Sequence, residues 1–269
     1  MPLYINVERI YNELRELGYS NDDALRPEEL FPFDQFHYHG TDAVETAARS
    51  LALGPTSRVL EIGSGLGGPA RYLAHKIGCP VTALELQSQL HQLACDLTTR
   101  TGLGDRVKHV PGDALTYPFS SAVFDAVVSW LAIHHIRERG RLLARCADTL
   151  KPTGKIYIED LYQRAPFAED DLPDVAQTIY GVTLTSAEDY VRDLHDAGFT
   201  NIEATDMTGD WTAFCGARTA AWRGTRERHE RVHGASTYAR LETFFSTVVR
   251  LFESGRLGGL RLIASRKPS

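Results

Sequence analysis

The segment VLEIGSGLGGPARYLA, residues 59–74, determines more of the fold than any other stretch of this chain. Its start is mostly apolar and predicts a buried strand from Arg58 to Gly63. Further glycines follow that strand, and Pro69 stands where the first turn of a helix would begin. Glycines are needed where a backbone turns sharply and approaches a ligand, because a Cβ atom would clash. The segment therefore predicts a strand, a glycine loop whose backbone N–H groups point at a ligand, and a helix.

The regions on either side of this segment predict an α/β fold. Strand candidates alternate with helix candidates, and this spacing is typical of a parallel sheet covered by helices on both faces. Two more strand candidates, NIEATDM (201–207) and GLRLIAS (259–265), lie near the C-terminus. The other predicted strands are 58–63, 80–86, 107–110, 124–130 and 155–159, and the predicted helices between them are 69–78, 90–101 and 137–150.

The two ends of the chain predict additions to this sheet. Apolar residues recur at helical spacing over residues 7–17, and Gly18 closes that segment. We expect residues 1–53 to form an N-terminal helical lid and residues 54–269 to form one Rossmann-like domain. Two insertions are expected in that domain, an aperiodic one at about 161–184 and a helical one at about 208–256.

Composition limits the possible partners. The 269 residues are 43% hydrophobic, enough for a sizeable core, and carry a formal net charge of -6, which disfavours binding to nucleic acid. No window approaches about 18 consecutive apolar residues, so we expect no membrane-spanning helix. The four cysteines show no CxxC pairing and suggest reduced thiols in a cytosol. We therefore expect a cytoplasmic protein with no nucleic-acid or membrane partner, and the oligomeric state is left open, a homodimer included.

The glycine loop fits either a nicotinamide dinucleotide or a nucleoside ligand that carries a positive charge. Gly63, Gly65 and Gly68 satisfy the GxGxxG pattern of nicotinamide-binding Rossmann folds. Glu61, however, places a carboxylate beside the loop, where it suits a positively charged group and is a poor neighbour for a pyrophosphate. Glu85 ends the next strand and can accept hydrogen bonds from both ribose hydroxyls, a feature that the two ligands share.

Two later motifs extend the pattern. Asp113 follows the third strand, where it can accept from an adenine amino group, and LKPTG (150–154) leads into the fifth strand. With the glycine loop and Glu85, these motifs resemble the class I S-adenosylmethionine-dependent methyltransferases over roughly residues 55–160, in the small-molecule branch that includes sarcosine/dimethylglycine N-methyltransferases. The resemblance implies a seven-stranded sheet, with six parallel strands and one antiparallel C-terminal strand. It also implies S-adenosylmethionine as methyl donor and S-adenosylhomocysteine as product. The expected cofactor-binding residues are Glu61, Gly63, Ser64, Gly65, Gly67, Glu85, Leu86, Gln87, Asp113, Ala114 and Leu131.

The catalytic candidates follow the fourth and fifth strands, because open α/β sheets bind ligands beyond the carboxyl ends of their strands. The stretch AIHHIRER (132–139) resembles the segment after strand four in small-molecule methyltransferases. Natural-product sugar O-methyltransferases of the rebeccamycin type use a histidine there with an Asp after the fifth strand. That resemblance implies His134 as the base and Asp160 as its partner. Packing inside the core is the alternative for His134 and for His135.

The N-terminal run DQFHYHG (34–40) is a second source of candidates. His37 and His39 are alternative bases, and aromatic rings can attract a cationic amine or the sulfonium of the donor. Because no carboxylate or cysteine spacing supports a metal site with these histidines, we expect no metal. The expected substrate-binding residues are Tyr11, Phe36, Tyr38, Trp130, His135 and Trp211, although core packing also explains Tyr11 and Trp211.

The sequence therefore predicts methyl transfer from S-adenosylmethionine to an N, C or O atom of a small metabolite, such as an amine or an aromatic natural product. The alternatives are a nicotinamide-dependent oxidoreductase and a donor-binding module without catalysis. Histidines outnumber substrate-anchoring cations in the segments considered, so a neutral or cationic acceptor is favoured.

Overall fold

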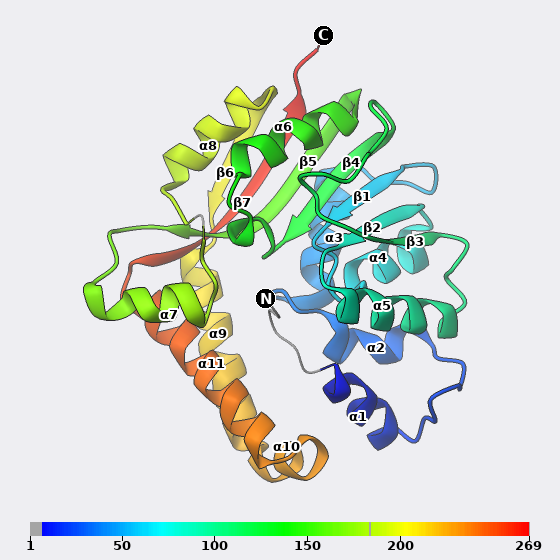
Figure 1. Ribbon diagram of the computed structural model, residues 1–269, viewed down its shortest axis with the longest axis vertical. Helices are drawn as coiled ribbons and strands as arrows, with labels where there is room; N and C mark the ends of the chain where they lie inside the picture. Colours follow the sequence, from blue (N-terminus) through cyan, green and yellow to red (C-terminus); the bar gives the residue numbers. More distant parts are fainter. Residues whose placement is uncertain (1–6, 183, 269) are drawn as a thin grey trace.

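The computed structural model describes residues 7–182 and 184–268. At its centre is a seven-stranded sheet with the strand order β3-β2-β1-β4-β5-β7-β6 (Figure 1). Neighbouring strands from β3 to β5 pair in parallel, and β7 pairs antiparallel with both β5 and β6. The predicted sheet of six parallel strands and one antiparallel strand is confirmed. The strands are β1 (Val59–Ile62), β2 (Val81–Glu85), β3 (Val107–Pro111), β4 (Phe124–Trp130), β5 (Leu150–Gln163), β6 (Phe199–Asp206) and β7 (Leu257–Arg266).

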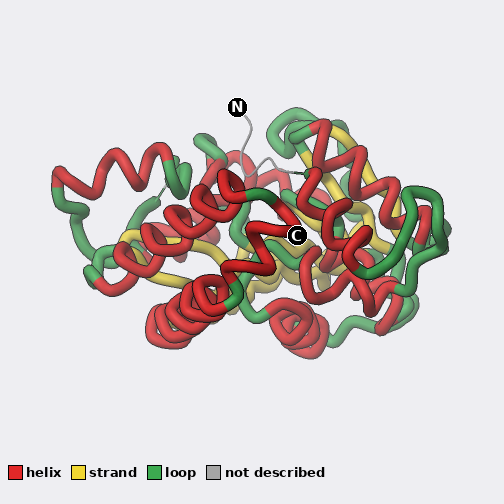
Figure 2. Tube along the Cα trace, turned by 90° about the horizontal axis from the view of Figure 1, so that it is seen from below, coloured by secondary structure: helices red, strands yellow, loops and turns green. Residues whose placement is uncertain are grey.

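Helices cover both faces of the sheet (Figure 2). On one face, α6 and α8 pack against alternate residues of β1, β4, β5 and β7. On the other face, α3 and the helical turn after the glycine loop pack against the remaining positions of β1, β2 and β4. The helices are α1 (Glu8–Glu16), α2 (Pro27–Asp34), α3 (Gly40–Ser50), α4 (Gly68–Tyr72), α5 (Ser88–Arg100), α6 (Arg139–Thr149), α7 (Leu172–Gln177), α8 (Ala187–Asp196), α9 (Thr208–Gly224), α10 (Arg226–His233) and α11 (Ala235–Glu253), with shorter turns η1 (Leu73–Ile77), η2 (Ile133–His135) and η3 (Glu169–Asp171).

Strand β5 is longer than the sequence pattern predicted. It runs from Leu150 to Gln163 instead of from Lys155 to Glu159, and it takes up the first residues of the segment expected to be an irregular insertion. The extension follows from pairing with β7, in which Leu161 lies opposite Gly259 and Gln163 opposite Leu257. A partner strand supplied from the other end of the chain thus fixes residues whose own sequence shows no clear period.

Residues of the N-terminal segment pack against the sheet and against α4. Val44 and Ala47 of α3 lie in the same buried cluster as Val59 of β1, so α3 belongs to the core of the domain. Asp34, at the end of α2, forms a fully buried ion pair with Arg71 of α4 at 2.8 Å. Both contacts join the N-terminal segment to the rest of the chain, and residues 1–6 of the expected lid lie outside the described residues.

The C-terminal insertion forms a helical arm of α9, α10 and α11 that extends from the sheet toward α1 (Figure 1). Its tip is joined to α1 by ion pairs from Arg228 to Glu13 and from Arg231 to Glu16, at 2.7 and 2.6 Å. No helix among the described residues is long and apolar enough to cross a membrane. The arm and α1 thus approach each other on the side of the sheet where the carboxyl ends of the parallel strands lie.

Candidate active site

The glycine loop between β1 and α4 takes a backbone conformation that favours glycine. Gly63, Gly65 and Gly67 have φ angles of 70°, 54° and 73°, which L side chains rarely adopt. A Cβ atom on Gly63 would also collide with Ala132, and one on Gly67 would lie 2.5 Å from His109. At Gly65 the nearest side-chain atom, from Phe36, is 4.0 Å away. The loop is therefore closely packed at Gly63 and Gly67 and has space over Gly65.

Glu85 holds the loop in place from the end of β2. Its two carboxylate oxygens accept hydrogen bonds from the backbone N–H groups of Gly65 and Gln87, both at 2.8 Å. Burial raises the pKa of Glu85. Each carboxylate oxygen can accept more than one hydrogen bond, so Glu85 can still receive hydroxyl groups of a ligand. Next to it, the side chain of Leu86 is 68% exposed and is accessible to a ligand.

Three buried polar atoms around the loop have no hydrogen-bond partner among the described residues. They are Oε2 of Glu61, Oγ of Ser64 and Oε1 of Gln87. Burial raises the pKa of Glu61 to about 8. Buried polar atoms are nearly always paired, so three unpaired ones at one loop mark a place for a polar ligand. All three residues had been predicted from the sequence to bind the donor.

The remaining donor candidates lie at the same edge of the sheet. The N–H of Gly112 donates to the backbone oxygen of Glu85 at 3.0 Å, which places Asp113 directly beyond β2. Oδ1 of Asp113 accepts from the N–H of Leu115 at 2.8 Å and is held by that bond. Leu131 has a φ of 50° at the end of β4, next to the loop residue Ala132 that faces Gly63. The fold therefore brings together the expected cofactor-binding residues from four strands.

The pair that the resemblance implied, His134 and Asp160, is in contact. Nδ1 of His134 lies 2.5 Å from Oδ1 of Asp160, and the residues are 2% and 0% exposed. The hydroxyl of Tyr190 donates to the other oxygen, Oδ2, at 3.0 Å. Burial raises the pKa of Tyr190 well above its usual value, so the hydroxyl stays a neutral donor. The three residues form a buried chain of hydrogen bonds from α8 to η2.

Sequence reasoning missed Tyr190. It lies on α8 in the sequence YVRDL, which carries no motif, and it reaches Asp160 only because α8 packs on the sheet. The guanidinium of Arg139 lies over its ring at 4.3 Å and is itself paired with Asp193. A buried tyrosine at helical spacing is usually a core residue, so no sequence signal could have marked it.

The other candidate histidines have different surroundings. Nδ1 of His135 lies 3.0 Å from the backbone oxygen of Tyr180, and burial lowers the pKa of His135 to about 3. His37 has one ring nitrogen 3.1 Å from the backbone oxygen of Tyr38 and the other 2.9 Å from Oε1 of Gln35, and burial lowers its pKa to about 4. Among the four candidate histidines in this part of the structure, only His134 lies against a fully buried carboxylate.

His39 and the aromatic candidates differ in how far they reach the loop. His39 forms an ion pair with Asp210 of α9 at 2.7 Å. Phe36 is 39% exposed and borders Gly65, so it is the aromatic residue best placed to meet a ligand. Trp211 is fully buried against Tyr38, with ring centroids 4.8 Å apart, as the packing alternative describes. Trp130 is buried and stacks on His37, and Tyr11 packs beside the cluster that joins α1, α2 and α5.

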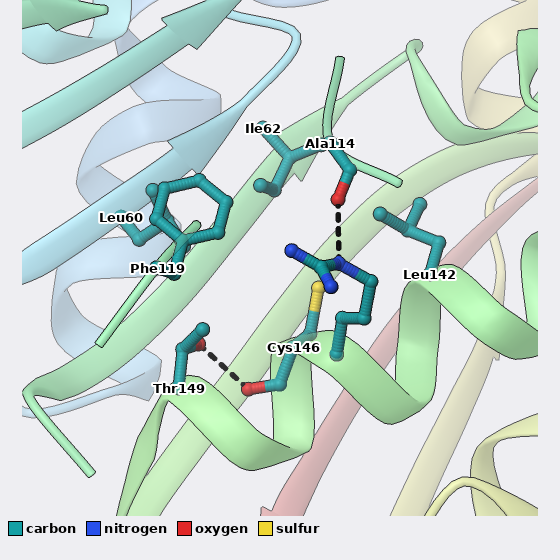
Figure 3. A pocket seen from close by; sticks show the side chains of 8 residues that line it. Leu60, Ile62, Ala114, Phe119, Leu142, Cys146 and Thr149 are labelled. Carbon is teal, nitrogen blue, oxygen red and sulfur yellow. Dashed lines mark hydrogen bonds between the residues drawn. The ribbon is translucent and has the colours of Figure 1, made fainter. Parts of the chain in front are cut away.

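The interior space drawn in Figure 3 is not this site. It lies beneath the sheet between α6 and the strands, is lined mostly by apolar side chains such as Leu60, Ile62 and Leu142, and is too narrow for a water molecule. One donor candidate, Ala114, borders it. There the backbone oxygen of Ala114 accepts a hydrogen bond from Nε of Arg145 at 2.9 Å. This bond holds the segment after Asp113 against α6.

Comparison with known proteins agrees with this geometry. Residues 60–158 match a protein family described as a methyltransferase domain. The chain is 32% identical to a sarcosine/dimethylglycine N-methyltransferase of Halorhodospira halochloris over 59% of its own length and 57% of that protein. It is 26% identical to the 27-O-demethylrifamycin SV methyltransferase of Amycolatopsis mediterranei over 97% and 93% of the two lengths.

A solved structure shares the fold over the whole chain. A phosphoethanolamine N-methyltransferase 2 of Haemonchus contortus, in complex with S-adenosyl-L-methionine, aligns with 100% of this chain and 62% of its own, with a TM-score of 0.82 and 21% identity. The chain spans 57% of the length of the Halorhodospira relative and 29% of a glycine/sarcosine/dimethylglycine N-methyltransferase of Actinopolyspora halophila. The predicted methyltransferase resemblance and the Rossmann-like fold are confirmed.

Proposed function

We propose that this chain, which contains a methyltransferase domain over residues 60–158, transfers a methyl group from S-adenosylmethionine to a nucleophilic N, C or O atom of a small metabolite. S-adenosylhomocysteine is the second product. The observation that carries the proposal is the set of unpaired buried polar atoms at the glycine loop, on Glu61, Ser64 and Gln87. Their number and position match a ligand with several polar groups, and the loop above Gly65 has the space for it.

The residues present fit this donor. The buried carboxyl group of Glu61 would hold the ammonium of the methionine end and give up its own proton on binding, since an opposite charge nearby favours the ionised form. Glu85 would accept the ribose hydroxyls and Asp113 the adenine amino group, with Leu86 against the face of the base. When bound, the donor supplies an electrophilic methyl group on a sulfonium. The nucleophile forms its bond to that methyl carbon while the carbon–sulfur bond breaks and its electron pair returns to sulfur.

His134 is the proposed base for acceptors that must lose a proton. Asp160 accepts a hydrogen bond from the Nδ1–H group of His134. Nε2 is therefore the ring nitrogen that takes the proton from the methyl acceptor. Tyr190 holds the far side of Asp160 and so fixes the carboxylate that orients the ring. Alignment of nucleophile and methyl carbon is the other main contribution that the chain can make, because the donor is already activated.

Calorimetry with S-adenosylhomocysteine tests the proposal directly. We expect the protein to bind it, and we expect Glu85→Ala to weaken binding by about 10-fold to 100-fold, the usual loss for hydrogen bonds to a charged group. Turnover is then sought with labelled S-adenosylmethionine against amines, indoles and phenols. Absence of binding to the wild-type protein would overturn the proposal, and thermal stabilisation by NADH in its place would support the dinucleotide alternative.

The expected partner is a small-molecule acceptor. The absence of a nucleic-acid partner stays a prediction from the net charge of -6, the absence of a membrane partner a prediction from the lack of a long apolar stretch, and the cytoplasmic location a prediction from the unpaired cysteines.

A further inference from the structure

Two arginines between α1 and the helical arm have no carboxylate partner among the described residues. Arg9 of α1 forms no ion pair or hydrogen bond there, and Arg218 of α9 has only a weak contact from its guanidinium to Sγ of Cys215 at 3.8 Å. Nε of Arg218 is buried without a partner. Half-buried guanidinium groups are normally paired, because removing a charge from water is costly unless an opposite charge replaces the lost hydration.

The neighbouring arginines of the arm show the usual arrangement. Arg223 pairs with Glu242, Arg228 with Glu13, and Arg231 with Glu16. Basic residues near the end of α9 and in α10 thus lie on an ion-paired face. Arg218 is the exception, because it points toward the interior of the arm.

The positive charges of Arg218 and Arg240 act on Arg9. The pKa of Arg9 is lowered, first by burial and further by the positive charges of Arg218 and Arg240. Glu13, the one carboxylate that acts on Arg9, already accepts hydrogen bonds from Arg228 and His233. Side chains from α1, α9 and α11 thus form a local excess of positive charge in a chain whose net charge is negative. A bound anion would relieve this repulsion.

Aromatic rings place this charge next to the glycine loop. The guanidinium carbon of Arg9 lies 5.7 Å from the ring centre of Phe36, whose Cδ2 is 4.0 Å from the Cβ position of Gly65. That of Arg218 lies 5.2 Å from the ring centre of Tyr38 and 4.5 Å from that of Phe245. A guanidinium stacked on a ring keeps the N–H groups at its edge for a planar or tetrahedral oxyanion.

We propose that Arg9 and Arg218 bind an oxyanion, a carboxylate or a phosphate group, carried by the methyl acceptor. The part that concerns the acceptor rests on the proposed function. The sequence favoured a neutral or cationic acceptor, whereas this proposal requires an anionic group. The difference arises because Arg9 and Arg218 lie far apart in the chain, outside the segments from which the acceptor was predicted. Aromatic side chains and two arginines together suit an acceptor with an apolar body and one anionic group.

Binding of three matched probes tests the proposal. Phenyl phosphate, benzoate and benzyl alcohol share an aromatic body and differ in carrying a phosphate, a carboxylate or no charge. Each is titrated by calorimetry into the protein, with and without saturating S-adenosylhomocysteine. We expect one or both anions to bind and benzyl alcohol to bind at least about tenfold more weakly. The preferred anion identifies the kind of acceptor group, and equal weak binding of all three would overturn the proposal.

Variants locate the site. Arg9→Gln and Arg218→Gln should each weaken anion binding by about tenfold or more, and Arg218→Lys should retain part of it. Arg223→Gln is the matched control, because Arg223 lies on the same helix and is paired with Glu242. Affinity for S-adenosylhomocysteine should stay within about twofold in every folded variant. If the double variant Arg9→Gln/Arg218→Gln binds the anions as the wild type does, the assignment is wrong even when the methyltransferase proposal holds.

Discussion

The hydroxyl of Tyr190 offers the sharpest test of the proposed catalytic group. It donates to Oδ2 of Asp160 at 3.0 Å, while Oδ1 of the same carboxylate lies 2.5 Å from Nδ1 of His134. Tyr190→Phe removes this hydroxyl and keeps the ring, so the packing of α8 should change little. The carboxylate of Asp160 is then left with one unsatisfied oxygen in the interior. Because a hydrogen bond to a charged group contributes about 1.5–3 kcal/mol, we expect the free energy of unfolding to fall by that amount.

The effect on catalysis distinguishes positioning from packing. With one donor fewer, Asp160 carries more negative charge toward His134 and holds the protonated ring more strongly. The rising limb of the pH profile of turnover should therefore move to higher pH. Turnover at neutral pH should fall by roughly tenfold, part of the 10²–10⁴-fold that a general base contributes. Affinity for S-adenosylhomocysteine should not change, because Tyr190 makes no contact with the glycine loop.

Tyr157→Phe is the control. The hydroxyl of Tyr157 is also buried and donates to a carboxylate, that of Glu159, at 2.6 Å on the same strand. Its loss should lower stability by a similar amount and leave the pH profile where it was. Turnover of the wild type and both variants is measured across pH with the labelled donor. Their stability is measured separately by denaturant unfolding. If the two variants shift the pH profile alike, or neither does, the assignment of Tyr190 as a positioning residue is refuted.

Three further results are expected. His134→Ala should lower turnover by about 10²–10⁴-fold while calorimetry shows unchanged donor affinity; equal losses in both would make His134 a structural residue. Burial raises the pKa of Glu61 from 4.5 to about 8, so the folded protein holds a proton there that the unfolded chain releases. The stability contributed by Glu61 should therefore be present below about pH 4.5 and be lost as pH rises toward 8, and Glu61→Gln should remove this slope from pH-dependent denaturant unfolding. Asp34→Ala leaves Arg71 buried without its partner and should cost about 3–5 kcal/mol of unfolding free energy, which a normal denaturation midpoint would contradict.

Much of the donor site could be predicted from sequence because its signals are local. The loop contains positive φ angles, which glycine adopts readily, at Gly63, Gly65 and Gly67. Glu85 reaches this loop from the end of the next strand. The order of strands and helices fixes which strand ends meet at one edge of a parallel sheet. The contact between His134 and Asp160 was also expected, although from resemblance to a family and not from the spacing of the residues.

Other features depend on contacts between distant segments. The last residues of β5 are a strand because β7 pairs with them, and α3 is a core element because β1 and β2 bury its apolar face. The packing of Trp211 shows the same dependence, since its ring lies against Tyr38 from the N-terminal run and so is buried. Periodicity within one segment carries no information on which other segment will cover it.

By itself, the sequence determined the glycine loop, the sheet that carries it and the residues at the strand ends, because short-range backbone requirements and the alternation of elements are written in consecutive residues. The tertiary structure alone decided which polar groups are paired. Tyr190 meets Asp160 through the packing of α8, and the charge of Arg218 acts on Arg9 through the approach of α1 to the helical arm. Whether a charge or a hydroxyl finds a partner depends on the positions of whole elements in space, and those positions follow from the burial of apolar faces and not from the residue itself.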